Sequence, residues 1–379
     1  MLPSNLPAPV RVLVLIFSVV FLVFTAAYLA YQTPAAACVL EHYSDSPAYN
    51  SPINKSESII DITLHKPDTS HSDTTSLQQV LQFIFNPKKF SLTEPSYIAN
   101  GTEYKLHGTP LYTKPLGKDI CIVDIDTRPY TNAHQVMHAG DFVWNDIDRY
   151  SAGMLSHYTY ATLHGYDYKF INAANYTDRS PTWIKPSAIA HLLPSYKFVV
   201  FLDADAAFNA MHIPLEWLLN YWHISADVAI AMALDPNAPT NYDRLHRLLT
   251  NTGFMIVQHN AVAMDMLRAW DECPGETRYP GCAEWKQPRF HEQSAFGNYV
   301  RYDYGEWIRE LPCDEANGEP EFGECRGVFV SHFWWRTDNV KRYFGMNALQ
   351  ALMGRVQGEM VERREEVVEV QAENVVANG

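Results

Sequence analysis

KFVVFLDADAAF, residues 197–208, is the stretch that decides the fold of this chain. Its apolar run FVVFL predicts a buried strand, and the run ends at Asp203 and Asp205. Residues two apart on an extended segment project to the same side. Two carboxylates at the end of a buried strand can hold Mn²⁺ or Mg²⁺, directly or through water. The stretch is therefore a first candidate metal site.

Strands and helices alternate on both sides of this stretch. Further strands are predicted at ICIVDID (120–126), within HGYDYKFIN (164–172), at DVAIAMALD (227–235) and at TGFMIVQH (252–259). Helices are predicted at 147–164, 183–193 and 260–272. This order predicts an α/β fold with an open, mostly parallel sheet, helices on both faces and ligands at the carboxyl ends of the strands.

The N-terminal segments differ in composition from this α/β region. Residues 12–31 carry no charge, and twenty helical residues span about 30 Å, the thickness of a bilayer core. Arg11 precedes the run and no Lys or Arg follows before Lys55, which favours a cytosolic N-terminus. A cleaved signal peptide is the alternative, but its apolar region normally runs only about 7–15 residues. The predicted order is a cytosolic tail at 1–11, a transmembrane signal anchor at 12–31, a stem and lead-in at 32–117, a catalytic domain at 118–345, and a charged helical or disordered tail at 346–379.

The cysteines and the glycosylation sequons agree with an oxidising, lumenal setting. Cys273 and Cys282 form one close pair, Cys313 and Cys325 another, and their Pro- and Gly-flanked loops favour disulfides. Zinc is the weaker alternative because spacings of nine and twelve match no ligand motif. Cys121, in an apolar strand, is expected to be a buried thiol, whereas Cys38 could be free, lipidated or intermolecular. The sequons lie at Asn54, Asn100 and Asn175.

The net charge and the acidic pairs limit the function. A net charge of −14 argues against nucleic acid, which needs clustered Lys and Arg. An acidic protein that handles an anionic ligand needs local cations, and a divalent metal is the simplest source. Three D-x-D pairs occur, at Asp124/Asp126, Asp146/Asp148 and Asp203/Asp205. The pair Asp146/Asp148 lies in helical context and is expected on a solvated face. The pair Asp124/Asp126 ends a strand, as Asp203/Asp205 does, so the strand context does not decide which of these two pairs binds the metal.

Five motifs in sequence carry a family resemblance. They are YATLHGYDYKF (160–170), WIKPSAIAHLLPSYKFVVFLDADAAF (183–208), NTGFMIV (251–257), HEQSAF (291–296) and SHFWW (331–335). In this order the chain resembles the nucleotide-sugar transferases of the GT-A fold, and most of all the galactosyl-, mannosyl- and xylosyltransferases of glycosyltransferase family 34. Two departures leave the donor sugar and the stereochemistry open. The strand is FVVFL rather than Trp-rich, and the late histidine is followed by Phe-Trp-Trp rather than by a nearby glycine.

The resemblance implies a role for each site residue. Asp203 and Asp205 would be the metal pair for Mn²⁺ or Mg²⁺, with His332 as the third ligand. Lys185 would pair with the diphosphate or with a donor hydroxyl. The remaining implied residues are Asn251, Thr252, Gly253, Asp124 and Asp126 for the donor, with Glu292 and Gln293 as catalytic residues.

Each role has a structural alternative. His332 would otherwise be a core histidine, Lys185 a solvated helix lysine, and Glu292 an acid that complements a helix start. Asn251, Thr252 and Gly253 would form a turn before a strand. Trp183, Trp334 and Trp335 are expected in the core more than on a sugar face.

The predicted function is metal-dependent transfer of a hexose or pentose from a nucleotide-diphosphate sugar to a glycan, with retention as in the resembled family. The predicted location is the Golgi membrane, as a single-pass type II protein with a lumenal catalytic domain. The alternative is a Golgi sugar-binding or scaffold protein that keeps the GT-A fold without activity. A two-metal hydrolase is disfavoured because the 15 histidines are scattered.

Overall fold

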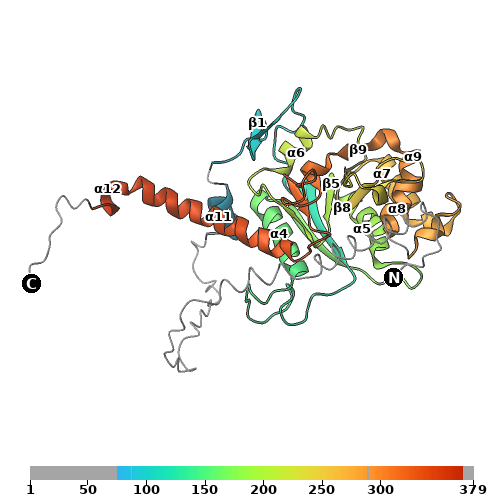
Figure 1. Ribbon diagram of the computed structural model, residues 1–379, viewed down its shortest axis with the longest axis horizontal. Coiled ribbons are helices and arrows are strands. Elements are labelled where there is room, and N and C mark those ends of the chain that lie inside the picture. The colour runs from blue at the N-terminus through green and yellow to red at the C-terminus, as the bar shows by residue number, and fades with distance from the viewer. Residues whose placement is uncertain (1–74, 87, 288–289, 370–379) are drawn as a thin grey trace, which may run out of the picture. The chain divides into compact units, whose positions relative to one another are not determined.

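The computed structural model describes residues 75–86, 88–287 and 290–369 (Figure 1). The predicted anchor at 12–31, Cys38, the sequon at Asn54 and the stem up to residue 74 lie outside this part of the chain. Within the described ranges, no helix combines the length and the apolar character that crossing a membrane requires.

A six-stranded mixed sheet organises the α/β region. Its spatial order is β4 (Asp167–Asn172), β3 (Ile120–Asp126), β5 (Phe198–Leu202), β8 (Thr250–Gln258), β7 (Ile230–Leu234) and β9 (Ile308–Leu311). β3 is parallel to β4 and to β5, and β7 is parallel to β9. β8 is antiparallel to both of its neighbours. Five strands therefore point one way and one is reversed, which confirms a mostly parallel α/β sheet.

Alternating side chains divide the core between the two faces of this sheet. Ile122 of β3 and Val200 of β5 pack on one face with residues of α4 (Arg149–His164). Val123 and Phe201 pack on the other face with residues of α5 (Ile184–Leu192) and α7 (Ala261–Asp271). Figure 1 shows these helices on opposite sides of the strands. Each fully buried Val, Leu or Phe contributes about 1.5–3 kcal/mol, so the central strands hold both layers together.

The start of α4 corrects one sequence-based expectation. Asp148 is the N-cap of the helix, and its carboxylate accepts hydrogen bonds from the backbone N–H groups of Tyr150 and Ser151. Asp146 lies in the turn before the helix and is exposed, as expected. The second D-x-D pair is thus a helix start rather than a helix face, because an acid at the N-cap satisfies amides that the first turn leaves unpaired.

Smaller elements surround the sheet. They are α3 (Leu77–Phe85), the hairpin of β1 (Ser96–Ala99) and β2 (Thr102–Lys105), the antiparallel pair of β6 (Ala206–Phe208) and β10 (Val330–His332), α6 (Leu215–Tyr221), α8 (His291–Ala295), α9 (Arg301–Asp303), α10 (Cys313–Ala316), α11 (Asn339–Glu362) and α12 (Arg364–Val367). Tyr104 and Tyr112, in the predicted stem and lead-in at 32–117, are buried in the same cluster as Ile122. The expected boundary at residue 345 falls inside α11.

The two predicted disulfides are present. Cys273 is bonded to Cys282, just after α7, and Cys313 at the start of α10 is bonded to Cys325. Cys121 is a buried free thiol, as expected. The second bridge closes a loop a few residues before the strand that carries His332.

Removing the Cys313–Cys325 bridge is expected to lower the thermal stability. Closing a loop of this length stabilises by about 2–3 kcal/mol, so Cys313→Ser/Cys325→Ser should lower the Tm by roughly 5–10 °C. Scanning calorimetry of the wild type and the variant, each with and without reductant, measures this. An unchanged wild-type melting curve under reducing conditions would show that neither bridge contributes.

Candidate metal and donor site

The turn after β5 is fixed by three neighbouring segments. The backbone N–H of Asp203 donates to the carbonyl of Gly253 in β8 at 2.8 Å. The carbonyl of Asp205 accepts from the N–H of Phe333, just after β10, also at 2.8 Å. Gly153 of α4 lies so close that a Cβ there would be 1.9 Å from the carbonyl oxygen of Ala204. The two carboxylates are therefore held on a rigid turn.

His332 reaches this turn through the short β6–β10 pairing. It lies opposite Ala206 in the antiparallel register. Its Nε2 is 3.3 Å from Oδ1 of Asp205 and 3.6 Å from Oδ2 of Asp203. The three ligand atoms lie within 4.8 Å of one another, and no other described group of His, Cys, Asp and Glu meets the same condition. The structure thus brings together the three residues expected to bind metal.

The charges of this cluster fit a divalent cation. Burial lowers the pKa of His332, but the carboxylates of Asp205 and Asp203 together outweigh burial and raise this pKa above its ordinary value. Burial raises the pKa of Asp203, although Lys185 and His332 oppose the shift. Two carboxylates and one imidazole form a ligand set of hard oxygens with one nitrogen, which suits Mn²⁺. Asp203, Asp205 and His332 would hold such an ion.

Lys185 is buried beside the acids rather than solvated on its helix. Its Nζ lies 2.9 Å from Oδ1 of Asp203 and 3.1 Å from Oε1 of Glu292, and its side chain is 7% exposed. Burial lowers the pKa of Lys185, but the carboxylates of Asp203 and Glu292 raise it above its ordinary value. Lys185 therefore stays charged next to the metal-binding turn.

A buried polar network connects the start of β8 to α8. The Thr252 hydroxyl donates to Oε1 of Glu292 at 3.0 Å, and its backbone N–H donates to Oε1 of Gln293 at 3.2 Å. Gln293 and Asn251 each donate an amide N–H to Asp235, at 2.7 and 2.8 Å. The residues expected to bind donor and acceptor thus share one network.

Asp235 is the member of this network that sequence reasoning missed. It directly follows β7 and is buried, and burial raises its pKa even though Asn251 donates to it. An acid at the end of an apolar strand, as in 227–235, is the signal that could have identified it. A cavity of about 350 Å³ borders Asp235 and is also lined by Pro236 and Phe322.

The first D-x-D pair is satisfied by its own surroundings. Asp124 is buried, and its two oxygens contact Nδ1 of His157 at 2.8 Å and the hydroxyl of Tyr168 at 2.6 Å. Asp126 is bonded to Arg128 at 2.6 Å and to the hydroxyl of Tyr130 at 2.7 Å. Of the two strand-end pairs, only Asp203 and Asp205 share a histidine that could complete a metal site.

The tryptophans divide between core and surface. Trp183 is fully buried, as expected, and donates to the carbonyl of Trp285 at 3.1 Å. Trp334 donates to Oδ1 of Asn317 at 3.2 Å, and Asn317 in turn contacts Asp235. Trp335 is 75% exposed, so the expectation of a core position is wrong for this residue.

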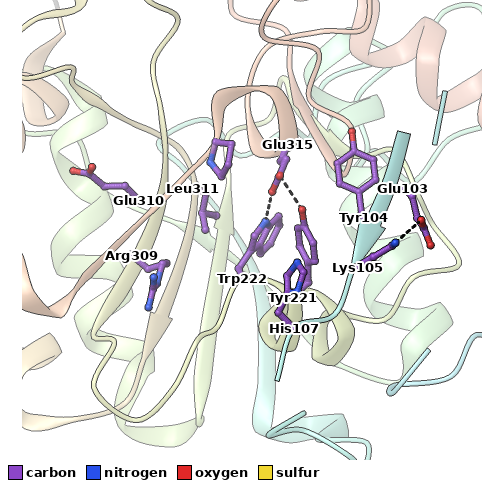
Figure 2. Close-up of a pocket in the computed structure, with 11 residues that line it drawn as sticks. Glu103, Tyr104, Lys105, His107, Tyr221, Trp222, Arg309, Glu310, Leu311 and Glu315 are labelled. Carbon is purple, nitrogen blue, oxygen red and sulfur yellow. Dashed lines mark hydrogen bonds and ion pairs between the residues drawn. The ribbon is translucent and has the colours of Figure 1, made fainter. Parts of the chain in front are cut away.

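A second cavity lies away from these residues. Figure 2 shows Trp222 and Tyr221 directed toward Glu315, which accepts a hydrogen bond from each, at 2.8 and 2.9 Å. The cavity has a volume of about 350 Å³ and is lined by residues of β2, β9 and α10. It contains none of the site residues predicted from the sequence.

Gly253 is required by the position of His332. A Cβ at this glycine would lie 2.1 Å from Cε1 of His332, which is closer than any real contact. We expect Gly253→Ala to displace the imidazole and to reduce the turnover of the predicted sugar transfer by about 100-fold or more, since a shift of about 1 Å can cost that much. Steady-state kinetics of the purified variant measure this loss of turnover. Gly354→Ala, where a Cβ meets nothing within 4 Å, is the matched control and should keep full activity. Equal turnover of both variants would contradict the role of Gly253.

The fold places an acid–acid–histidine cluster at the carboxyl end of a central strand, which is where open α/β sheets commonly bind their ligands. Residues 157–326 match the family model described as nucleotide-diphospho-sugar transferase. This match includes Lys185, Asp203, Asp205 and Glu292. The chain is a glycosyltransferase that uses a nucleotide-sugar donor. No curated protein matches the chain.

Three solved structures illustrate the similarity. A glycosyltransferase involved in the glycosylation of the major capsid of PBCV-1 is 13% identical, with 60% of this chain and 99% of that chain covered and a TM-score of 0.43. Mouse xyloside xylosyltransferase 1, apo form, is 10% identical, with coverages of 58% and 99% and a TM-score of 0.36. The glycosyltransferase GlyE of Streptococcus pneumoniae TIGR4 is 10% identical, with 64% of each chain covered and a TM-score of 0.33.

Proposed function

We propose that the chain is a GT-A transferase that needs a divalent metal, Mn²⁺ or Mg²⁺, and moves a hexose or pentose onto a glycan with retention. The observation that carries this proposal is the cluster of Asp203, Asp205 and His332 at the end of β5, beside the charged Lys185. The order of the sequence motifs supports membership of glycosyltransferase family 34. The family match supports the nucleotide-sugar donor.

The reaction breaks the bond between the anomeric carbon and the diphosphate, and forms a bond to an acceptor oxygen. A cation held by Asp203, Asp205 and His332 would act as a Lewis acid toward the leaving diphosphate. Lys185 adds a fixed positive charge next to the same position, where negative charge develops on the leaving group. The acceptor proton leaves with the diphosphate.

Glu292 is suited to stabilise a cationic sugar. Burial raises the pKa of Glu292, but the charge of Lys185 and the hydrogen bonds that Glu292 accepts together hold the pKa below its usual range, so the side chain is ionised. An ionised carboxylate fixed by Lys185 and Thr252 is a weak base, which favours electrostatic stabilisation and retention over proton abstraction from the acceptor. Gln293, Asn251 and Asp235 supply amide and carboxylate groups for sugar hydroxyls.

The donor nucleotide is expected at the end of β3. Asp126 is partly exposed and lies beside the half-exposed Arg128, so these side chains can contact the base and ribose. Asp124 is occupied by His157 and Tyr168 and would position the strand end. Gly253 leaves room for the imidazole of His332.

A type II location in the Golgi membrane accounts for the remaining features. Disulfides form in oxidising compartments, and both bridges lie in the catalytic region. Asn100 and Asn175, the two described sequon residues, are exposed and so available for glycosylation. The uncharged run at 12–31 would supply the single membrane helix.

A donor panel tests the proposed function. The purified full-length chain is incubated with UDP-galactose, UDP-xylose, UDP-glucose or GDP-mannose, with Mn²⁺ or with a chelator, and released nucleotide diphosphate is scored. We expect one donor to be consumed only when the metal is present. Failure with every donor, together with metal-independent binding in a titration, would favour an inactive sugar-binding or scaffold protein. The intact cluster argues against that alternative.

A further inference from the structure

A buried histidine outside the proposed mechanism connects the end of β3 to the metal-binding turn. His157 lies on α4 and is fully buried. Its Nδ1 is 2.8 Å from Oδ1 of Asp124, and its Nε2 is 2.9 Å from the carbonyl oxygen of Ala206. Ala206 directly follows Asp205 in the chain. One imidazole therefore joins the first D-x-D pair to the third.

Both ring nitrogens of His157 are placed to donate. A backbone carbonyl can only accept, so Nε2 carries a proton and donates to Ala206. Burial lowers the pKa of His157, but the charge of Asp124, the two hydrogen bonds of the ring and the charge of Asp203 together raise it above its ordinary value. The hydroxyl of Tyr168 donates to the second oxygen of Asp124 at 2.6 Å. The carboxylate is thus held from two sides and can orient the ring.

The carbonyl of Ala206 is directed toward α4 by the pairing of β6 with β10. Antiparallel strands direct the carbonyls of alternate residues toward their partner strand. The carbonyl of Asp205 accepts from the N–H of Phe333, so the carbonyl of the next residue faces the other way, toward His157. Ala206 is fully buried, and its carbonyl depends on a donor inside the protein. His157 supplies that donor.

α4 contacts the metal-binding turn at a second point, one helical turn before His157. A Cβ at Gly153 would lie 1.9 Å from the carbonyl oxygen of Ala204, so only a glycine lets the helix approach this closely. Positions 153 and 157 lie on the same face of the helix. The N–H of Ala206 also donates to the carbonyl of Asp203 at 2.8 Å, which closes the turn. The helix therefore contacts the backbone on both sides of the second carboxylate.

We propose that His157 is a positioning residue of the metal site, which fixes the turn of Asp203 and Asp205 relative to the end of β3. In this role Asp124 orients the imidazole, and the first D-x-D pair acts on the metal through the histidine rather than as a ligand. The inference rests on the proposed metal dependence and goes beyond it by naming the residues that hold the ligands in place. Replacing such supporting groups typically weakens metal binding by about 10–100-fold.

Two amide variants of His157 separate the two hydrogen bonds of the ring. The amide nitrogen of His157→Asn can replace Nδ1 and keep the bond to Asp124, whereas that of His157→Gln can replace Nε2 and keep the bond to Ala206. We expect His157→Asn to raise the Mn²⁺ dissociation constant by about tenfold or more, and His157→Gln to change it by less than about threefold. Electron paramagnetic resonance of free Mn²⁺, titrated into the purified full-length chain without a donor, measures both constants.

His164→Asn is the matched control for these variants. His164 lies on the same helix, and its Nε2 makes the same kind of hydrogen bond, to the carbonyl of Met211 at 2.8 Å, so this variant should bind Mn²⁺ like the wild type. Steady-state transfer gives a second measurement. His157→Asn should raise the KM for Mn²⁺ and keep turnover at saturating Mn²⁺ within about threefold of the wild type, whereas a protein that is only destabilised would lose turnover at an unchanged KM.

The outcomes separate this inference from the proposed function. An unchanged affinity and KM for Mn²⁺ in His157→Asn, or an equal loss of affinity in His157→Gln or His164→Asn, would overturn the role of His157 alone. If His157→Asn does not fold, His157→Gln decides the question, because the proposal requires that this variant bind Mn²⁺ nearly as well as the wild type. A wild-type chain that binds no Mn²⁺ would overturn the proposed metal dependence together with this inference.

Discussion

Asp203→Asn is expected to reduce sugar transfer by about 1,000-fold or more while the protein stays folded. The substitution removes one negative charge from the acid–acid–histidine cluster and replaces an anionic metal ligand with a neutral one. Removing one electrostatic group beside a developing charge lowers turnover by about 10²–10³-fold. Here the substitution would also weaken binding of the cation itself. Released nucleotide diphosphate, measured at saturating donor and Mn²⁺, gives the effect on turnover.

Asp146→Asn is the matched control for this prediction. Asp146 belongs to another D-x-D pair but lies exposed in the turn before α4, so its variant should keep wild-type turnover. The melting temperature of Asp203→Asn should stay close to that of the wild type, which separates lost chemistry from lost structure. Wild-type turnover of Asp203→Asn at saturating Mn²⁺ would show that the metal is not held there.

Lys185→Met is expected to reduce both stability and turnover. Without the ammonium group, the carboxylates of Glu292 and Asp203 lose the cation that now lies within 3.1 Å of each. Breaking one partner of a buried ion pair costs about 3–5 kcal/mol, and the partial exposure of Asp203 reduces this to roughly 2–3 kcal/mol. Turnover should fall by about 100-fold or more, since the leaving group loses a fixed positive charge. Urea unfolding and donor turnover measure the two effects.

Lys118→Met controls for the loss of a lysine as such. Lys118 has a 73% exposed side chain and contacts Asp167 at 3.5 Å, so its variant should change the free energy of unfolding by less than about 0.5 kcal/mol. If Lys185→Met unfolds at the wild-type urea concentration and keeps its turnover, Lys185 has neither of the roles given to it.

The central strands and the acid pair were predictable because their signals are local. An apolar run that ends in two acids can be recognised from the sequence alone. The predicted helices at 147–164, 183–193 and 260–272 correspond to α4, α5 and α7. The reversed direction of β8 was not predictable, because it depends on which neighbours the strand pairs with rather than on its own residues.

The completed site depends on contacts between distant segments. His332 reaches the acids through three residues of antiparallel pairing between β6 and β10, a contact that no periodic pattern encodes. Only the family resemblance indicated its role. Asp235 was missed because its partners, Asn251 and Gln293, lie on other elements. For the same reason the sequence left open whether Lys185 was solvated, whereas the fold buries it between two acids.

The measurement that tests the central claim most directly is anomalous diffraction from a crystal grown with Mn²⁺ and a sugar nucleotide. The account predicts one manganese peak roughly 2–2.5 Å from oxygens of Asp203 and Asp205 and from Nε2 of His332, in contact with the diphosphate. A peak at Asp124 and Asp126 instead, or a bound sugar nucleotide with no manganese near residue 203, would contradict it.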